Sequence, residues 1–314
     1  MKKPLIILAG PTAVGKTKLS ISLAKTVGGE IISADSMQVY RHMDIGSAKI
    51  QPEEMEGIVH HLVDVLEPDE EFHVVRFQQM AKAAVEEIYE RGRIPILVGG
   101  TGFYIQALLY DIDFTKNESD PKYRRYLEEL VQKKGPGYLH EMLKKTDAKS
   151  AESIHPHNSK RVIRALEFYN QTGKKISEHN RVERQKQSPY HFAYFVLYDE
   201  RKRLYERIDS RVDQMLKEGL VKEVQALKDR GCIRDMVSMQ GLGYKEILAY
   251  LDGETSFEEA VYRIKRDTRH FAKRQLTWFK REKDVIWMNK GDFENEEHSL
   301  LGKMQEELIK RNIC

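Results

Sequence analysis

The first hundred residues alternate short apolar runs with amphipathic stretches. Residues 5–9 are wholly apolar, which is typical of a strand buried in a parallel sheet, and residues 16–27 follow with apolar positions at helical spacing. The alternation continues, with strands predicted at 30–33 and 94–98 and an amphipathic helix at 74–91. We therefore expect an α/β fold built on a parallel sheet.

From about residue 115 the pattern changes, because strand-like runs disappear and helical periodicity takes over. We interpret 115–189 as an all-helical insertion domain between a first core segment at 1–114 and a mostly helical core completion at 190–314. Two further strands are predicted at 192–197 and 285–288. Helices are predicted at 123–134, 138–145 and 159–171 in the insertion, and at 201–218, 220–230, 244–251 and 257–281 after it.

The composition is that of a soluble globular protein. Of 314 residues, 40% are hydrophobic and 32% are charged, which excludes a mainly disordered or low-complexity chain. Only Cys232 and Cys314 are present, so neither a disulfide framework nor a four-cysteine zinc site can form. No apolar run approaches the ~20 residues needed to span a bilayer. We expect a cytoplasmic protein without membrane spans.

Charge is distributed unevenly along the chain. The net charge is only +3, but residues 158–186 carry eight Lys or Arg against three Glu, and residues 263–281 carry eight against one Asp. The remainder of the chain is therefore acidic, with a net charge of −9. Two basic segments in an otherwise acidic protein suit a polyanion such as RNA, although two solvated helix faces would give the same pattern.

A phosphate-binding loop follows the first strand. The pattern GxxxxGK[ST] stands between a buried strand and a helix, which is the context that its mechanism requires. Backbone N–H groups and the helix N-terminus can then face an anion, Lys16 adds a positive charge, and the hydroxyl of Thr17 can ligate Mg²⁺. The pattern leaves open which diphosphate-containing ligand is bound. Its residues are Gly10, Pro11, Thr12, Ala13, Val14, Gly15, Lys16 and Thr17.

The acidic residue of this site is in an unusual place. Nucleoside triphosphatases often carry an Asp at the end of a second apolar strand, but the strand at 94–98 ends in Gly99-Gly-Thr-Gly102. Asp35 instead follows the strand at 30–33, at the edge where open α/β sheets bind ligands. The residue is a candidate for chemistry, and a turn or helix cap is the competing interpretation.

Six motifs stand in order along the chain, at 10–17, 35–40 with 43–46, 99–104, 161–167, 243–246 and 272–278. Together they resemble the tRNA dimethylallyltransferase family. The resemblance implies a P-loop NTPase-like α/β core with a helical insertion, and transfer of a dimethylallyl group from its diphosphate to N6 of the adenosine just 3′ of the anticodon. Ser47, Phe103 and Gln240 depart mildly from the family pattern, and the lack of a cysteine-rich zinc finger favours the bacterial type.

The resemblance also assigns roles to residues. Asp35 corresponds to the carboxylate that accepts the adenine amine proton, with Thr101 assisting, while Lys16 and Arg211 contact the diphosphate. This matches the need of a poor amine nucleophile for a base and a stabilised leaving group. The helix at 263–281 is expected to add contacts to the tRNA backbone. By resemblance the tRNA path is lined by Asp35, Ser36, Met37, Gln38, Thr101, Arg124, Ser159, Lys160, Arg161, Val162, Ile163, Gln240, Gly241, Leu242, Gly243, Tyr244 and Lys245.

The expected partners are the tRNA anticodon stem-loop and dimethylallyl diphosphate, with Mg²⁺ as cofactor, and we expect a monomer. Two other classes fit the residues less completely. A nucleotide kinase would use the same loop for ATP, and a non-catalytic RNA-binding protein would leave Lys16, Thr17 and Asp35 without a task. The histidines at 60–61 and 155–157 lack metal-ligand spacing. Trp278 and Phe279 are expected on a core-facing stripe.

Overall fold

The protein is described here by a computed structural model. It divides into two compact units, and we describe each by itself. Unit 1 comprises Met1–Leu109 and Pro189–Cys314, and unit 2 comprises Tyr110–Ser188, where the sequence pattern predicted a helical insertion at 115–189. The residues that the structure describes are 2–114, 120–183, 185–293 and 296–314.

Unit 1 is built on a six-stranded sheet in the order β3-β2-β4-β1-β5-β6, and every neighbouring pair is parallel. Ile7 of the central strand lies opposite Leu97 on one side and Tyr194 on the other. The expected α/β fold with a parallel sheet is thus confirmed. The strands are β1 (Pro4–Ala9), β2 (Gly29–Ala34), β3 (His60–His61), β4 (Ile94–Gly99), β5 (His191–Tyr198) and β6 (Val285–Asn289).

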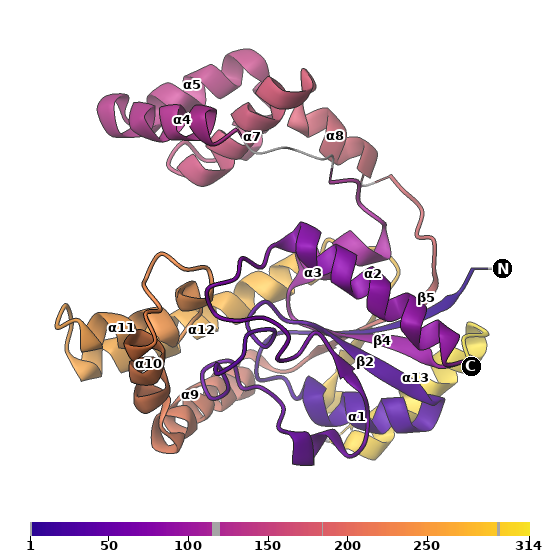
Figure 1. Cartoon of the computed structure of the whole chain (residues 1–314). Coiled ribbons are helices and arrows are strands. Elements are labelled where there is room, and N and C mark those ends of the chain that lie inside the picture. Colours follow the sequence, from indigo (N-terminus) through magenta and orange to yellow (C-terminus); the bar gives the residue numbers. More distant parts are fainter. Residues whose placement is uncertain (1, 115–119, 184, 294–295) are drawn as a thin grey trace. The chain divides into compact units, whose positions relative to one another are not determined.

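Helices cover both faces of this sheet. In Figure 1, α1 and α13 lie on one face and α2 and α3 on the other. Strand β1 is therefore buried on both faces, which explains its uninterrupted apolar sequence. The helices of unit 1 are α1 (Lys16–Val27), α2 (Val74–Glu90), α3 (Gly102–Leu109), α9 (Arg201–Glu218), α10 (Leu220–Asp229), α11 (Tyr244–Leu251), α12 (Phe257–Phe279) and α13 (Glu297–Lys310).

The regular secondary structure in the described residues of unit 2 is helical. Leu127, Leu139, Leu143 and Val162 are fully buried in a core of their own. Asp147 joins two of its helices, since its carboxylate accepts hydrogen bonds from Ser150 and Ser177. The helices are α4 (Pro121–Lys134), α5 (Pro136–Thr146), α6 (Ala148–Ser153), α7 (Ser159–Thr172) and α8 (Ile176–Glu183).

Several elements were absent from the sequence-based prediction. Strand β3 has two residues and α6 has six, so each is too short to establish a periodicity, and the eight residues of α8 include only two apolar positions. Helix α3 is apolar on nearly every side and begins on a glycine run that resembles a loop. Helix α13 was also missed, and three short 3₁₀ segments occur at Pro52–Met55, Ser238–Gln240 and Lys290–Phe293. No helix in the described part of the chain is long and apolar enough to cross a membrane.

Candidate active site

The phosphate loop, residues 10–17, joins β1 to α1 at the carboxyl edge of the sheet. Ala13 and Gly15 take left-handed backbone conformations, with φ of 61° and 94°. Gly10 is needed for a close approach, because a Cβ there would lie 2.6 Å from the carbonyl oxygen of Leu197 on β5. A loop of this shape directs backbone N–H groups toward an anion at the start of the helix.

Lys16 is the buried cation of the loop. Its Nζ donates hydrogen bonds to the carbonyl oxygens of Gly10 at 3.0 Å and Pro11 at 2.8 Å. Burial lowers the pKa of Lys16 to about 8, the negative charge of Asp35 opposes that shift, and the positive charge of Arg211 adds to it. Lys16 thus has carbonyl partners but no carboxylate within ion-pair distance among the described residues, a state that a bound diphosphate would relieve.

Arg211 brings a second cation to the same site from α9. Burial lowers the pKa of its guanidinium, and Asp35 opposes the shift as the largest favourable charge. Within the described residues the guanidinium makes neither a hydrogen bond nor an ion pair. A partly buried, unpaired guanidinium suits a phosphate ligand, which its five N–H donors match geometrically.

Asp35 supplies the negative charge of the cluster. Its Oδ1 accepts hydrogen bonds from the backbone N–H of Met37 at 2.8 Å and of Gln38 at 3.4 Å, so this oxygen closes the turn after β2. The other oxygen, Oδ2, makes no hydrogen bond with any residue in the described ranges. The cap interpretation and the chemical interpretation therefore apply to different oxygens of one carboxylate.

Thr101 stands at the neighbouring strand end. Its N–H donates to the carbonyl oxygen of Ala34, the residue before Asp35, at 3.3 Å, and its carbonyl oxygen accepts from Tyr104 at the start of α3. Gly99 permits this approach, since a Cβ there would lie 2.3 Å from the same carbonyl of Ala34. Asp35 also contributes to a raised pKa of Tyr104, mainly caused by burial. Asp35 and Thr101 thus belong to one site.

The segments 35–46 and 240–245 pack against each other. Glu223 on α10 organises the contact, because its carboxylate accepts from the N–H groups of Asp44, Ile45 and Gly46 at 2.7–3.0 Å and from the hydroxyl of Tyr244 at 2.7 Å. Gly46 must be small here, since its Cβ would lie 2.5 Å from the Tyr244 ring. Tyr244 is fully buried, whereas Gln240 is exposed.

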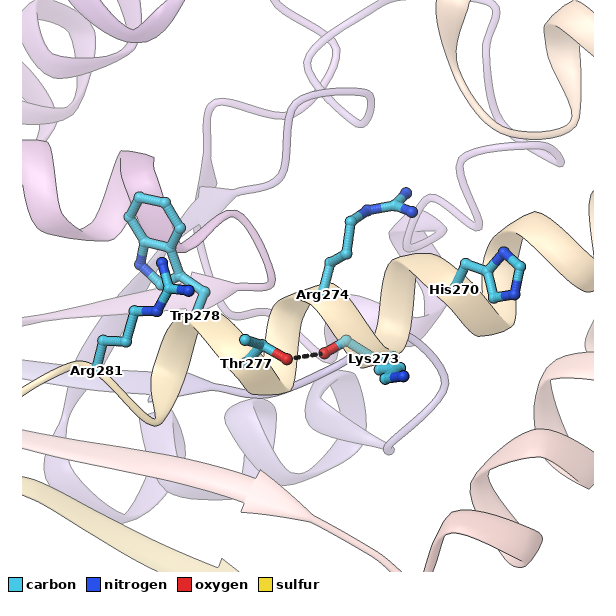
Figure 2. Close-up of a pocket in the computed structure, with 6 residues that line it drawn as sticks. All are labelled: His270, Lys273, Arg274, Thr277, Trp278 and Arg281. Atoms are coloured by element: carbon cyan, nitrogen blue, oxygen red, sulfur yellow. Dashed lines mark hydrogen bonds between the residues drawn. The ribbon is translucent and has the colours of Figure 1, made fainter. Parts of the chain in front are cut away.

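An open basic groove of about 460 Å³ lies along α12. Figure 2 shows its lining side chains, which come from the C-terminal half of α12 and, in the case of Arg281, from the turn after it. Trp278 forms one wall and packs on α3, where a Cβ on Gly102 would lie 2.2 Å from its ring and Phe103 meets it edge-on at 6.0 Å. Of the two aromatic residues expected on the core-facing stripe, Phe279 is fully buried and Trp278 is only partly buried. The lining residues are His270, Lys273, Arg274, Thr277, Trp278 and Arg281.

Unit 2 carries its own exposed cations. Lys160, Arg161 and Arg164 are exposed on α7 and make no ion pair within the described ranges. Arg124 differs, since it lies 3.3 Å from Glu128 and 3.6 Å from the buried Glu167. Val162 and Ile163, also candidates on α7, are buried in the core of the unit, so their side chains hold the helix in place and do not reach its surface. Ser159, the first residue of the helix, is partly exposed.

Comparison with known proteins identifies the family. Residues 38–282 match the model of the IPP transferase family. The chain is 64% identical over 311 residues to a tRNA dimethylallyltransferase of Lachnoclostridium phytofermentans, covering 99% of both chains, and 52% identical over 292 residues to that of Geobacillus thermodenitrificans, covering 93% and 92%. The chain belongs to the tRNA dimethylallyltransferase family. It is therefore a transferase that modifies tRNA.

Solved structures agree with this assignment. The full-length tRNA isopentenylpyrophosphate transferase of Bacillus halodurans superimposes with a TM-score of 0.74 at 46% identity, covering 99% of this chain and 98% of that one. A eukaryotic dimethylallyltransferase acting on tRNA gives a TM-score of 0.79 at 34% identity, covering 91% and 74%. The resemblance inferred from the six motifs is confirmed.

Two residues of this tRNA dimethylallyltransferase escaped the sequence analysis. Glu223 and Gln275 each bridge separate segments through a side chain. Glu223 lies outside the six motifs, and Gln275 lies within the last of them but was given no role. The groove on α12 was anticipated only as a basic segment. The only signal for Gln275 is its place among the buried positions of an otherwise polar helix, between Ala272 and Phe279.

The residues fit a magnesium ion bound together with the substrate rather than a protein cage. No group of three or more His, Cys, Asp or Glu side chains that could hold a metal occurs in the described ranges. The hydroxyl of Thr17 makes no hydrogen bond to a described residue and stands at the start of α1. Magnesium is commonly held by few protein ligands plus substrate phosphates. His61, considered above, instead pairs with Glu30 at 2.8 Å.

Proposed function

We propose that Lys16, Arg211, Asp35 and Thr101 carry out the family reaction, transfer of a dimethylallyl group from dimethylallyl diphosphate to N6 of the adenosine 3′ of the anticodon. The observation that supports this most is the cluster of Lys16, Asp35 and Arg211 beside the phosphate loop. It combines two partly buried cations for a leaving group with one carboxylate for an amine. A phosphotransferase could use the same cations and the carboxylate as well, so labelling of the tRNA distinguishes the two classes.

The donor half of the site holds the diphosphate. Backbone N–H groups of the loop, Lys16 and Arg211 contact its oxygens, and these contacts strengthen as negative charge develops on the breaking C1–O bond. The Thr17 hydroxyl and the diphosphate oxygens would hold Mg²⁺, which when bound neutralises part of the phosphate charge. Lys16 would exchange the carbonyl oxygens of Gly10 and Pro11 for the oxygens of the diphosphate.

The acceptor half holds and deprotonates the adenine amine. The N6 amine donates a hydrogen bond to Oδ2 of Asp35, and the Thr101 hydroxyl helps to orient it. The bond from N6 to C1 of the dimethylallyl group forms as the C1–O bond breaks, diphosphate leaves with the bonding electron pair, and the amine proton passes to Asp35. The target base must leave its stack to reach the carboxylate, at a cost of a few kcal/mol.

The tRNA would contact several basic surfaces. The loop at 35–38 and its neighbour at 240–245 lie nearest the proposed chemistry. The α12 groove adds Lys273, Arg274 and Arg281 beside the Trp278 ring, and these cations make no ion pair with any described residue. Such a combination suits a phosphate backbone with an unstacked base. On unit 2 the α7 cations and Arg124 would add further contacts. We propose that the enzyme works as a monomer in the cytoplasm, since one chain supplies every group named.

The deciding experiment combines the protein with dimethylallyl diphosphate labelled in its dimethylallyl group, Mg²⁺ and tRNA from cells lacking this modification. Digestion of the tRNA should release labelled N6-isopentenyladenosine in stoichiometry with free diphosphate. A tRNA with guanosine in place of the target adenosine is the matched control and should stay unlabelled. Formation of ADP from ATP and a nucleoside monophosphate, with unlabelled tRNA, would instead assign the protein to the nucleotide kinases.

A further inference from the structure

Gln275 joins the two substrate loops through one buried amide. Its side chain projects from α12 and is 6% exposed. Its Oε1 accepts from the N–H of Thr12 in the phosphate loop at 2.9 Å, and its Nε2 donates to the carbonyl oxygen of Gly100 at 3.0 Å. One loop holds the diphosphate, and the other carries Thr101. The bridge therefore connects the donor half of the site to the acceptor half.

The chemistry of the bridge permits few other side chains. A backbone N–H can only donate and a backbone carbonyl can only accept, so the bridging group must offer an acceptor to Thr12 and a donor to Gly100. An amide offers both without charge. A carboxylate would face the Gly100 carbonyl with a second acceptor, and an apolar side chain would leave two backbone groups unpaired in a buried place.

The glycine loop is shaped around α12. A Cβ on Gly100 would lie 2.1 Å from Nε2 of Gln275. One turn further along the helix, the Trp278 ring leaves no room for a Cβ on Gly102. Glycine is required at position 100 because a side chain there would collide with the Gln275 amide. The backbone does not require it, since the φ of Gly100 lies outside the left-handed region. Contacts with α12 therefore fix the position of the glycine loop on both sides of Thr101.

We propose that Gln275 is a positioning residue that sets the separation between the bound diphosphate and the adenine amine. The proposal rests on the proposed function, because it assigns the donor to one loop and the acceptor to the other. In-line transfer requires the reacting N6 and C1 atoms to meet in a narrow range of geometry, and a misplacement of about 1 Å costs on the order of a hundredfold in rate. Gln275 touches neither substrate and acts through Thr12 and Gly100.

The test compares two buried glutamines changed to methionine, which keeps the length of the side chain and removes its hydrogen bonds. Gln275→Met is the test variant. Gln78→Met is the matched control, because Gln78 is also buried and donates to a carbonyl, that of Ala107, outside both substrate loops. Thermal midpoint, tRNA affinity and single-turnover rate with saturating substrates are measured for both and for the wild type.

We expect both variants to lose a similar amount of thermal stability and to bind tRNA within about twofold of the wild type. Only Gln275→Met should slow the single-turnover step, by about tenfold or more. Equal rates in the two variants would overturn the proposal, since the bridge would then be merely structural. A wild type that labels no tRNA would instead refute the proposed function, so the two failures are distinguishable.

Gly100→Ala probes the same contact from the other side and decides the matter if Gln275→Met does not fold. Its methyl group should expel the Gln275 amide and slow the same step by about tenfold or more. In the double variant, Gly100→Ala with Gln275→Ala, the shorter side chain at 275 leaves space for the methyl group at 100. The loss of rate, expressed as a free energy, should therefore be smaller than the sum of the losses of Gly100→Ala and Gln275→Ala measured singly. Full additivity of the two losses would contradict a shared contact.

Discussion

Asp35 meets two demands at the scale of a single residue. Its Oδ1 closes the turn by accepting from the N–H groups of Met37 and Gln38. Its Oδ2 makes no hydrogen bond with any described residue, and we propose that it receives the amine. Asparagine can keep the first role through its carbonyl oxygen but cannot accept a proton, and its NH₂ group would turn a donor toward the adenine amine. The structure therefore offers a substitution that separates folding from chemistry.

For Asp35→Asn we expect an unchanged thermal midpoint, moderate to full tRNA affinity and a loss of about two or more orders of magnitude in the single-turnover rate. All three are to be measured on one preparation. A lowered midpoint with a near-normal rate would make Asp35 a turn cap and nothing more.

Lys16 gives the site a dependence on pH. Burial lowers the pKa of its ammonium group to about 8, against 10.5 for the free side chain. A bound diphosphate favours the charged lysine, so binding above pH 8 must take up a proton. We expect the dissociation constant of dimethylallyl diphosphate to rise above about pH 8, approaching tenfold per pH unit.

The matched control for that titration is Lys16→Arg, which stays charged over the same range. The ratio of its dissociation constant to that of the wild type cancels the titration of the diphosphate itself. This ratio should fall as the pH rises from 7 to 9.5. A constant ratio would mean that Lys16 does not titrate where its burial indicates.

Arg211, which we propose contacts the diphosphate, should contribute to function at the expense of stability. Burial disfavours its charge, and no described residue bonds to its guanidinium. Arg211→Met should therefore lower the turnover by about two orders of magnitude, while the thermal midpoint of the ligand-free protein stays the same or rises. A midpoint lower by more than about 4 °C, a loss of roughly 1 kcal/mol or more, would identify Arg211 as a structural residue.

At the scale of elements, the sequence pattern predicted the five longer strands to within a residue or two at each end. Apolar runs such as that of β1 are unambiguous because both of their faces are covered. The α3 helix was missed because Gly99, Gly100 and Gly102 resemble a loop. Glycine is required at these positions because a side chain would collide with Ala34, Gln275 or Trp278, which are distant in sequence.

In the candidate site, too, some features could be predicted from the sequence and others could not. The phosphate loop is a local motif and was visible in the sequence, whereas the bridges of Glu223 and Gln275 depend on which loops lie beside them. A buried polar residue on a helix reveals its partner only in three dimensions. Arg211 and Thr101 were assigned by family resemblance, because no local pattern distinguishes them from an ordinary helix arginine and loop threonine.

The α7 cations allow a prediction for one element. Lys160, Arg161 and Arg164 are exposed and unpaired in the described structure, so they are available to phosphates. Changing all three to glutamine should weaken tRNA binding and reduce the slope of log affinity against log salt by about one unit per contact removed. Dimethylallyl diphosphate binding should be unchanged.

Lys133→Gln on α4 provides the control in unit 2, since its charge is paired with Glu129 at 3.6 Å. We expect this variant to keep the wild-type salt slope. If the triple variant bound tRNA as the wild type does at every salt concentration, the α7 cations would be an ordinary solvated face.

At the scale of the whole molecule, two cores serve two tasks. The core of unit 1 supports the sheet edge where donor and acceptor meet, and includes Leu23 of α1. The core of unit 2 supports the α7 surface and includes Leu139 of α5. Each leucine is fully buried in its own cluster. This separation predicts that tRNA affinity and donor binding can be weakened independently.

Leu139→Ala is the direct test, because replacing a fully buried leucine by alanine typically costs about 2–5 kcal/mol. Amide hydrogen exchange should accelerate across Tyr110–Ser188 and stay unchanged in the strands of unit 1. The affinity for tRNA should fall, while that for dimethylallyl diphosphate should match the wild type. Leu23→Ala should give the reverse pattern, with faster exchange in unit 1 and weaker donor binding. Faster exchange in both units of either variant would show that the two cores unfold as one, and that donor binding cannot be separated from the stability of the helical unit.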